Sequence, residues 1–279
     1  MTVLAEFDNT TAKTANTPRR FAGLERLYGI DGAARIRASH IGVIGIGGVG
    51  SWSAEALARS GVGQLTLVDM DHISESNVNR QIHALTDTLG QSKIVAMRDR
   101  ILQINPECQV TLVDDFVGAD NWPQILPNAV DAVLDACDQI TAKTAIAAWA
   151  LGNKRPMITV GAAGGKRQAH RVEIDDLSHC THDPLLTQLR YRLRKSHGGA
   201  REGKKIGLAC VFSREEVRLP MASVVSKEAS REGGDAAGNE VDKRDGTLNC
   251  HGYGSVVSVT ATFGLCAAGW LLDKISIGT

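Results

Sequence analysis

The feature that most constrains the fold of this chain is a glycine-rich turn within residues 40–51, which read HIGVIGIGGVGS. The apolar residues 41–46 predict a short buried strand, and residues 51–60 predict a helix, so the glycines lie between them. Gly45, Gly47 and Gly50 have the G-x-G-x-x-G spacing, in which absent side chains allow a tight turn and leave helix N–H groups facing an anion. The stretch therefore predicts a nucleotide phosphate site.

The residues after the turn favour a triphosphate over a dinucleotide. Residues 64–68 predict a second strand, and it ends at Asp69, in the position where an acid binds ribose hydroxyls. A dinucleotide, as in a dehydrogenase, would need only Gly45 to Gly50 and Asp69. Further polar and cationic side chains follow that a triphosphate would use: Asp71, Asn77, Asn79, Arg80, Gln81 and Lys93. Arg80 and Lys93 would stabilise the charge that develops as pyrophosphate leaves.

Helical and extended patterns alternate up to residue 160. The segments 93–105, 109–113, 122–126, 130–134, 141–151 and 157–160 predict helix, strand, short helix, strand, helix and strand. This alternation indicates a doubly wound, Rossmann-like α/β fold with a mainly parallel sheet. The strand 130–134 leads into Asp135-Ala136-Cys137-Asp138, at the sheet edge where such folds bind ligands. Cys137 is expected to be a packed residue, and Asp135 a turn or helix-capping acid.

The chain divides by pattern into a mobile tail (1–18), an ATP-binding adenylation core (19–160) and a C-terminal α+β extension (161–279). Within the core, residues 19–38 predict helical pieces broken at Gly29 and Gly32. In the extension, residues 183–196 predict an amphipathic helix that continues into a basic loop up to residue 205. This basic stretch suits an RNA backbone, although a solvated face is an equal alternative. Residues 221–247 predict a disordered surface loop.

Residues 254–272 are apolar over almost the length that crosses a bilayer. Interspersed Ser, Thr and Gly favour an internal helix instead. The cluster His179-Cys180-Thr181-His182 is too compact to complete a zinc site.

The charge balance and the cysteine pattern limit the classes of protein to which this chain could belong. Basic and acidic residues balance at 31 each, which argues against non-specific coating of nucleic acid. Six cysteines form no C-x-x-C pair, and no secretory signal is visible, so a cytoplasmic, reduced protein is expected. Cys250 is the best thiol candidate for any covalent step, with a packed cysteine as the favoured alternative.

The reaction class follows from what the glycine turn lacks. A P-loop kinase would carry Lys after the last glycine, whereas Ser51 follows Gly50 here. Adenylation is therefore favoured over phosphoryl transfer: a carboxylate attacks the α-phosphorus, and the mixed anhydride carries AMP as a good leaving group.

These motifs together resemble the ubiquitin-activating-enzyme-like adenylating family, which includes the molybdopterin and thiamine sulfur-carrier activators. The resemblance is carried by the glycine turn with Gly48 and Ser51, Asp69-x-Asp71, Asn77-x-Asn79-Arg80-Gln81, Lys93 and Asp135 to Asp138. Segments 20–29, 79–85, 105–108 and 259–264 are similar to one branch, the tRNA threonylcarbamoyladenosine dehydratases. The similarity spans roughly residues 20–270.

The resemblance implies ATP and Mg²⁺ as cofactors, with Arg80, Lys93 and Asp138 catalytic. It implies that the nucleotide is bound by Gly45, Gly47, Gly48, Gly50, Asp69, Asp71, Asn77, Asn79, Arg80, Gln81, Lys93, Asp138 and Gln139. Asp138 would help to hold the magnesium. It also implies a homodimer in which Arg20 or Arg26 reaches the partner's ATP, and a possible cysteine desulfurase or sulfur-acceptor partner.

The implied substrate is N6-threonylcarbamoyladenosine in tRNA, next to the anticodon. Its threonyl carboxylate would be adenylated, and the urea group of the same side chain would then close a ring and release AMP. Intramolecular geometry would supply much of the rate. The alternatives are an activator of a ubiquitin-like sulfur-carrier protein and a non-catalytic nucleotide-binding module.

Overall fold

The computed structural model describes residues 17–126, 129–218 and 253–278. The predicted loop 221–247, the thiol candidate Cys250 and most of the predicted tail lie outside these residues. Thr17, which was expected in the tail, is the first residue of a helix.

A seven-stranded sheet organises the described chain, in the order β3-β2-β1-β4-β5-β7-β6. The strands are β1 (His40–Ile44), β2 (Gln64–Val68), β3 (Gln109–Val113), β4 (Ala132–Asp135), β5 (Met157–Val160), β6 (Val172–Asp176) and β7 (Ala209–Ser213). Neighbouring strands are parallel except for β6 and β7, which are antiparallel. The predicted doubly wound, mainly parallel sheet is confirmed.

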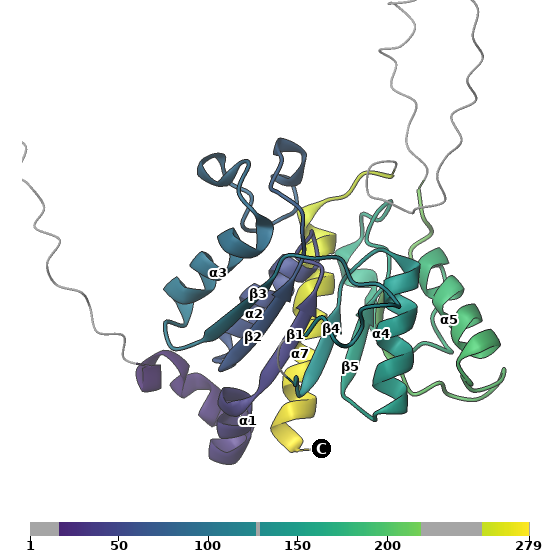
Figure 1. Cartoon of the computed structure of the whole chain (residues 1–279), viewed down its shortest axis with the longest axis horizontal. Coiled ribbons are helices and arrows are strands. Elements are labelled where there is room, and N and C mark those ends of the chain that lie inside the picture. Colours follow the sequence, from purple (N-terminus) through teal and green to yellow (C-terminus); the bar gives the residue numbers. More distant parts are fainter. Residues whose placement is uncertain (1–16, 127–128, 219–252, 279) are drawn as a thin grey trace, which may run out of the picture.

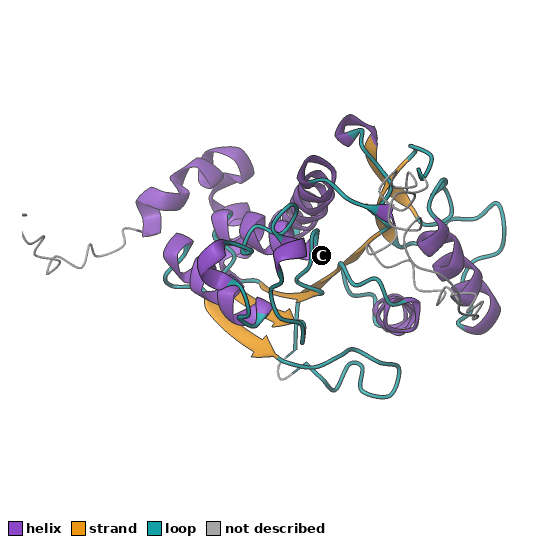
Figure 2. Cartoon of the chain, turned by 90° about the horizontal axis from the view of Figure 1, so that it is seen from above, coloured by secondary structure: helices purple, strands orange, loops and turns teal. Residues whose placement is uncertain are grey.

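Helices cover both faces of this sheet (Figures 1 and 2). They are α1 (Thr17–Ala38), α2 (Gly50–Arg59), α3 (Lys93–Ile104), α4 (Ile140–Gly152), α5 (Pro184–Ser196) and α7 (Val257–Ile277). Apolar side chains of α2, α3 and α7 form one core cluster with the sheet, and those of α4 and α5 form another. Short 3-10 turns lie at Glu75–Asn77, Thr86–Thr88 and Ala169–Arg171.

The sequence pattern suggested that the alternation ends at residue 160. In the structure it continues beyond that residue. Strand β7 pairs in parallel with β5, with Thr159 opposite Cys210, and β6 adds an antiparallel edge. The predicted extension thus contributes two strands to the central sheet. The long excursion between β5 and β7, which contains α5, hides this pairing from a local pattern.

Helix α7 is an internal helix. It packs against α2 at Gly264, where an added Cβ would lie 2.5 Å from the Val49 carbonyl oxygen, and the Ser53 hydroxyl donates to the Gly264 carbonyl at 3.1 Å. Val259, Phe263 and other residues along its length are buried in the core. None of the helices in the described ranges is both long and apolar enough to cross a membrane.

Two local predictions are wrong. Residues 122–125 form turns and no helix covers 122–126, in line with Leu126 preceding a proline in the sequence, which disfavours helical backbone at that residue. Helix α1 breaks at Gly29, as predicted, where φ is 73°, but it continues through Gly32. A Cβ at Gly32 would lie 3.3 Å from the Ser276 carbonyl oxygen, so this glycine lets α1 approach the end of α7.

Candidate active site

The candidate site lies where the direction of chain winding reverses. Strands β1 and β4 are neighbours in the middle of the sheet, and the chain proceeds from β1 to β2 and β3 on one side and from β4 to β5 on the other. Ligands of open α/β sheets bind at the carboxyl ends of such a strand pair. The turn after β1 packs closely on the loop after β4: an added Cβ on Gly45 would lie 3.0 Å from backbone atoms of Ala136 and Cys137.

Each glycine of the turn has a distinct physical role. Gly45 has φ 85°, and a Cβ on Gly50 would overlap the Gly45 carbonyl oxygen at 1.8 Å. The backbone itself therefore requires glycine at both positions. Gly47 has open space on its Cβ side, so its backbone can be approached closely from outside. Gly48 lies against the side chain of Arg80, with 3.3 Å between the added Cβ and that chain's methylene carbons.

The start of α2 presents groups suited to an anion. The first N–H groups of a helix have no partner within the helix, and they carry the positive end of its dipole. The hydroxyl of Ser51 is buried here and has no hydrogen-bond partner among the described residues. Together with the exposed backbone at Gly47, these donors fit a nucleotide phosphate.

Asp69 ties the end of β2 to the glycine turn. Its carboxylate accepts hydrogen bonds from the Ile46 N–H at 2.6 Å and the Asp71 N–H at 2.9 Å. Burial raises the pKa of Asp69, although the nearby Lys93 and these N–H donors oppose that shift. The structure therefore places Asp69, the predicted ribose ligand, beside the glycine turn.

Lys93 is buried in the first turn of α3 and pairs with Asp71. Its Nζ lies 2.7 Å from Asp71 Oδ2, and its backbone N–H donates to the Asp71 carbonyl at 3.0 Å. The structure thus brings these two predicted nucleotide ligands into direct contact. The pairing also means that the ammonium group is already oriented before any phosphate binds.

The loop between β2 and α3, which carries Arg80, is held by several hydrogen bonds. Arg80 donates from Nη1 to the Ser76 carbonyl at 2.5 Å and to Asn79 Oδ1 at 3.0 Å. The Asn79 amide donates to the Ser255 carbonyl at 2.9 Å, which ties this loop to the segment before α7. Trp52 of α2 donates from Nε1 to the Arg80 carbonyl at 2.9 Å. These bonds hold the Arg80 side chain, whose methylene carbons lie next to Gly48.

Asn77 and Gln81, two further predicted nucleotide ligands, are buried like Lys93. Asn77 Oδ1 accepts from the Ser74 N–H at 3.1 Å and so stabilises a 3-10 turn. Gln81 is 6 % exposed, and its Oε1 has no partner in the described chain. His83, two residues further on, is also buried with both ring nitrogens unpaired, and burial and the nearby Lys93 lower its pKa to about 4. No motif in the sequence predicts a role for His83.

A fully buried ion pair shapes the loop after β4. Asp135 Oδ2 accepts from Lys143 Nζ at 2.8 Å and from Thr159 Oγ1 at 2.6 Å, while Oδ1 accepts from the backbone N–H of Cys137. Asp135 is thus a turn-stabilising acid, which was one of its two predicted roles, and not a helix-capping acid. Lys143 and Thr159 were missed, yet Lys143 is the one charged residue of α4, which is a detectable signal.

Cys137 is a packed thiol. Its Sγ donates to Asp135 Oδ1 at 2.9 Å, and burial together with the Asp135 charge raises its pKa well above the ordinary value. A protonated thiol beside a carboxylate is a poor nucleophile, in agreement with the packed interpretation.

Asp138 and Gln139 follow this loop and are exposed. Within the described ranges, Asp138 makes no hydrogen bond or ion pair, and no group of three acidic, His or Cys side chains could hold a metal ion. A single carboxylate fits Mg²⁺ only where phosphate oxygens and water complete the coordination, as is usual for nucleotide-bound magnesium.

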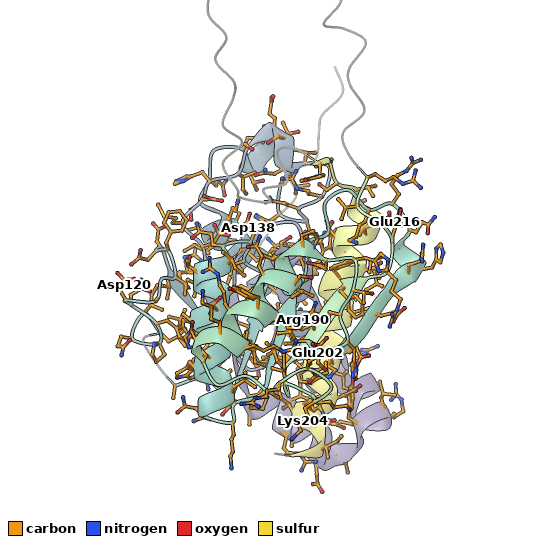
Figure 3. The ribbon with its side chains drawn as sticks, turned by 90° about the vertical axis from the view of Figure 1, so that its right-hand side faces the viewer. Asp120, Asp138, Arg190, Glu202, Lys204 and Glu216 are labelled. Atoms are coloured by element: carbon orange, nitrogen blue, oxygen red, sulfur yellow. The ribbon has the colours of Figure 1, made fainter. Side chains whose placement is uncertain are left out.

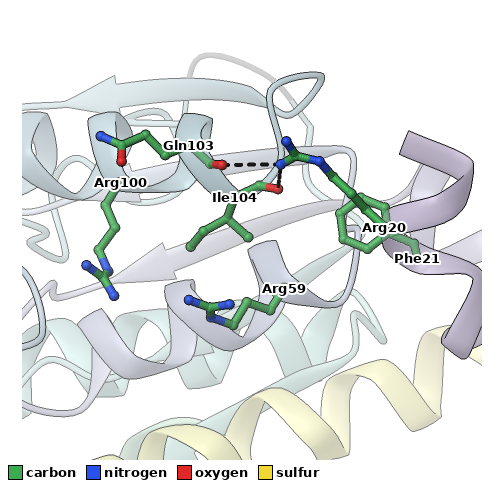
Figure 4. Close-up of a pocket in the computed structure, with 6 residues that line it drawn as sticks. All are labelled: Arg20, Phe21, Arg59, Arg100, Gln103 and Ile104. Atoms are coloured by element: carbon green, nitrogen blue, oxygen red, sulfur yellow. Dashed lines mark hydrogen bonds between the residues drawn. The ribbon is translucent and has the colours of Figure 1, made fainter. Parts of the chain in front are cut away.

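The two candidate arginines for a partner subunit differ in their contacts. Arg20 Nη1 donates to the carbonyls of Gln103 at 3.2 Å and Ile104 at 2.6 Å, at the end of α3 in its own chain (Figure 4). It lines a cavity of about 470 Å³ together with Phe21, Arg59 and Arg100. Arg26 is exposed, and the described residues provide it with no hydrogen bond or ion pair.

The chain matches the ThiF family over residues 19–277. It belongs to the ThiF family. It is 43% identical to the tRNA threonylcarbamoyladenosine dehydratase of Escherichia coli K12, over 92% of this chain and 93% of that protein. It is 40% identical to the Haemophilus influenzae Rd protein of the same name, over 99% of this chain and 97% of that protein. The crystal structure of the E. coli enzyme in complex with ATP superposes with a TM-score of 0.78, covering 92% of this chain and 94% of that one, at 40% identity.

These similarities confirm the resemblance and the Rossmann-like architecture proposed from the sequence. The ThiF family match spans both the glycine turn and α7, so it includes the strands that local patterns missed.

Proposed function

We propose that this ThiF family member is an ATP-dependent tRNA threonylcarbamoyladenosine dehydratase. The observation that carries the proposal is the assembly of Arg80, Lys93 and the glycine turn at the strand switch point. Relatives that bear this name match almost the full length of the chain at 40% identity or more. The solved E. coli relative is described in complex with ATP. The reaction belongs to the cytoplasm, where tRNA is available.

In this proposal ATP lies across the carboxyl ends of β1, β2 and β4. Asp69 binds the ribose hydroxyls, and the N–H groups around Gly47 and the Ser51 hydroxyl donate to phosphate oxygens. Arg80 and Lys93 bind the outer phosphates. Mg²⁺, held by Asp138 and phosphate oxygens, would neutralise part of the charge on the leaving pyrophosphate.

The reaction has two balanced steps. An oxygen of the threonyl carboxylate forms a bond to the α-phosphorus while the bond from that phosphorus to the β-phosphate oxygen breaks, releasing pyrophosphate. The urea group then attacks the activated carboxyl carbon, loses a proton, and displaces AMP. One water is removed overall. Because both reacting groups belong to one side chain, proximity replaces a covalent enzyme intermediate, and the protonated Cys137 has no required role.

We further propose a homodimer in which Arg26 is the arginine that reaches the partner's nucleotide. Arg20 is held by carbonyls of its own α3, whereas Arg26 is exposed and has no such contact in the described structure.

The test compares two acceptors. Purified protein is incubated with ATP, Mg²⁺ and either tRNA carrying N6-threonylcarbamoyladenosine or a ubiquitin-like sulfur-carrier protein, and pyrophosphate is measured. We expect release with the tRNA alone, together with a modified nucleoside lighter by the mass of one water. Arg80→Ala should abolish both signals. The matched control is Arg98→Ala, which removes an arginine that pairs with the adjacent Asp99 on α3. Turnover with the carrier protein but not with tRNA would overturn the proposal.

A further inference from the structure

Helix α5 carries a strongly basic face that the adenylation chemistry does not use. Its 13 residues contain four cations, Arg190, Arg192, Arg194 and Lys195, and no Asp or Glu. Its leucines are buried against the sheet and α4. In the part of the chain that the structure describes, none of the four cations forms an ion pair with a carboxylate. The outer face of α5 therefore has uncompensated positive charge.

A shallow groove of about 340 Å³ lies on this face, and it is lined by Thr187, Arg190, Tyr191, Arg194 and Lys195. These residues recur at three- and four-residue intervals, so they share one side of the helix. Tyr191 is 61% exposed, and Lys195 Nζ lies 5.5 Å from the centre of its ring. An exposed aromatic ring among cations is the combination that single-stranded RNA-binding surfaces use.

The two groove arginines are held in place by backbone carbonyls. Arg190 Nη1 donates to the carbonyls of Leu177 at 3.0 Å and Cys180 at 2.8 Å, and Arg194 Nε donates to that of Ala200 at 3.0 Å. Each guanidinium retains further N–H donors with no partner among the described residues. Because these side chains are already ordered, binding a phosphate would restrict them less than it would restrict free ones.

Helix α5 begins at the sheet edge that carries the candidate active site, and the groove lies further along the helix. The N-cap residue Asp183 accepts a hydrogen bond from the Ala162 N–H at 2.8 Å, just beyond the end of β5, so α5 begins at the same sheet edge as the glycine turn. Arg190 lies about 10 Å further along the helix axis. Figure 3 shows Arg190 at mid-height, with Asp138 toward one end of the molecule and Lys204 toward the other.

We propose that this groove binds the RNA substrate outside the reaction centre, with an unpaired base stacked on Tyr191 and flanking phosphates bound by Lys195, Arg190 and Arg194. The inference rests on the proposed function, which makes tRNA the substrate. RNA fits the groove better than an acidic protein does, because the exposed ring offers a stacking surface that carboxylates would not use.

The test measures RNA affinity directly. Labelled tRNA carrying N6-threonylcarbamoyladenosine is titrated with full-length protein at several salt concentrations, and Kd is read by fluorescence anisotropy. Tyr191→Ala should weaken binding about tenfold, with little change in salt dependence, whereas Tyr191→Phe should bind like the unaltered protein because its ring can still stack. Lys195→Ala should reduce the slope of log affinity against log salt by about one.

Arg192→Ala is the matched control, because it removes the same charge from the same helix at a position that does not line the groove. We expect it to weaken binding by less than about twofold. Normal affinity of Tyr191→Ala, or an equal loss in Arg192→Ala and Lys195→Ala, would overturn the inference. The inference would also be overturned if polyglutamate displaced the tRNA and its own binding was weakened to the same extent by Tyr191→Ala.

Turnover separates this inference from the proposed function. With the groove variants, the KM for tRNA should rise while kcat and the KM for ATP stay near those of the unaltered protein. If the variants bound tRNA and catalysed dehydration normally, the groove would not be an RNA site, while the proposed function would stand. If tRNA binding depended on the groove but ATP-dependent dehydration was not detected, the RNA site would stand and the proposed function would be wrong.

Discussion

Single residues in the loop after β4 show how a buried charge can hold a site in place. Asp135 and Lys143 are both completely buried, and Asp135 also accepts from the Thr159 hydroxyl. Such a pair contributes little net stability relative to apolar residues, but removal of one partner leaves an unpaired charge inside the protein. The pair orients the backbone from which Asp138 and Gln139 project.

Lys143→Met should therefore destabilise the protein by about 3–5 kcal/mol in the free energy of unfolding, measured by urea titration. The double variant Asp135→Asn with Lys143→Met should recover much of this loss, because it removes both charges. A single variant as stable as the unaltered protein would show that the ion pair does not constrain this loop.

His83 should make stability depend on pH. Burial and Lys93 lower its pKa from 6.5 to about 4 in the folded state. The unfolded chain binds a proton first as pH falls below 6.5, so stability is lost between pH 6.5 and 4 and this contribution then levels off. The full loss corresponds to about 3 kcal/mol.

His83→Phe should flatten this part of the profile, as measured by urea unfolding at a series of pH values. His72→Phe is a control, because His72 is exposed. If His83→Phe retained the same slope between pH 6.5 and 4, the buried imidazole would not be its source.

At the scale of elements, the glycine turn couples two different requirements. Gly45 and Gly50 are needed for the strand-to-helix turn, because Gly45 has a φ of 85° and a Cβ at Gly50 would collide with the Gly45 carbonyl oxygen. Gly47 is not needed for packing, since its Cβ side is open. Gly45 and Gly50 are thus required for folding of the turn, whereas Gly47 leaves the backbone open to a ligand.

Two alanine substitutions separate these requirements. Gly50→Ala should lower the thermal midpoint strongly, because its Cβ would lie 1.8 Å from the Gly45 carbonyl oxygen. Gly47→Ala should change the free energy of unfolding by less than about 1 kcal/mol, yet raise the KM for ATP because its methyl group would project toward the bound phosphates. Equal thermal midpoints for the two variants would contradict this division.

For the whole molecule, the proposed homodimer makes the activity depend on the position of two arginines. Arg20→Ala should lower the free energy of unfolding by about 0.5–1.5 kcal/mol, because it removes an exposed donor from the carbonyls at the end of α3. Arg26→Ala should leave the unfolding curve unchanged and reduce turnover.

Subunit mixing tests this assignment. Arg26→Ala and Arg80→Ala are each expected to be nearly inactive alone, but a mixed dimer contains one site with both arginines intact. Activity should therefore return when the two variants are unfolded and refolded together, to about half of the sites in each mixed dimer. No recovery, in dimers shown to be mixed, would place Arg26 outside the partner's site.

Short-range pattern in the sequence was enough to predict the doubly wound sheet, the glycine turn and the family. Strand-to-helix turns and apolar periodicity are local properties, so residues 40–51 and the strands β2, β3 and β5 could be recognised from their own side chains. The basic character of α5 was visible for the same reason.

Only the tertiary structure decided which distant residues meet. The pairing of β7 with β5, the burial of Lys143 against Asp135 and the contacts that hold Arg20 but not Arg26 all join segments separated along the chain. Local patterns do not encode these contacts, because their free energy depends on surfaces that come together only when the sheet and helices have packed.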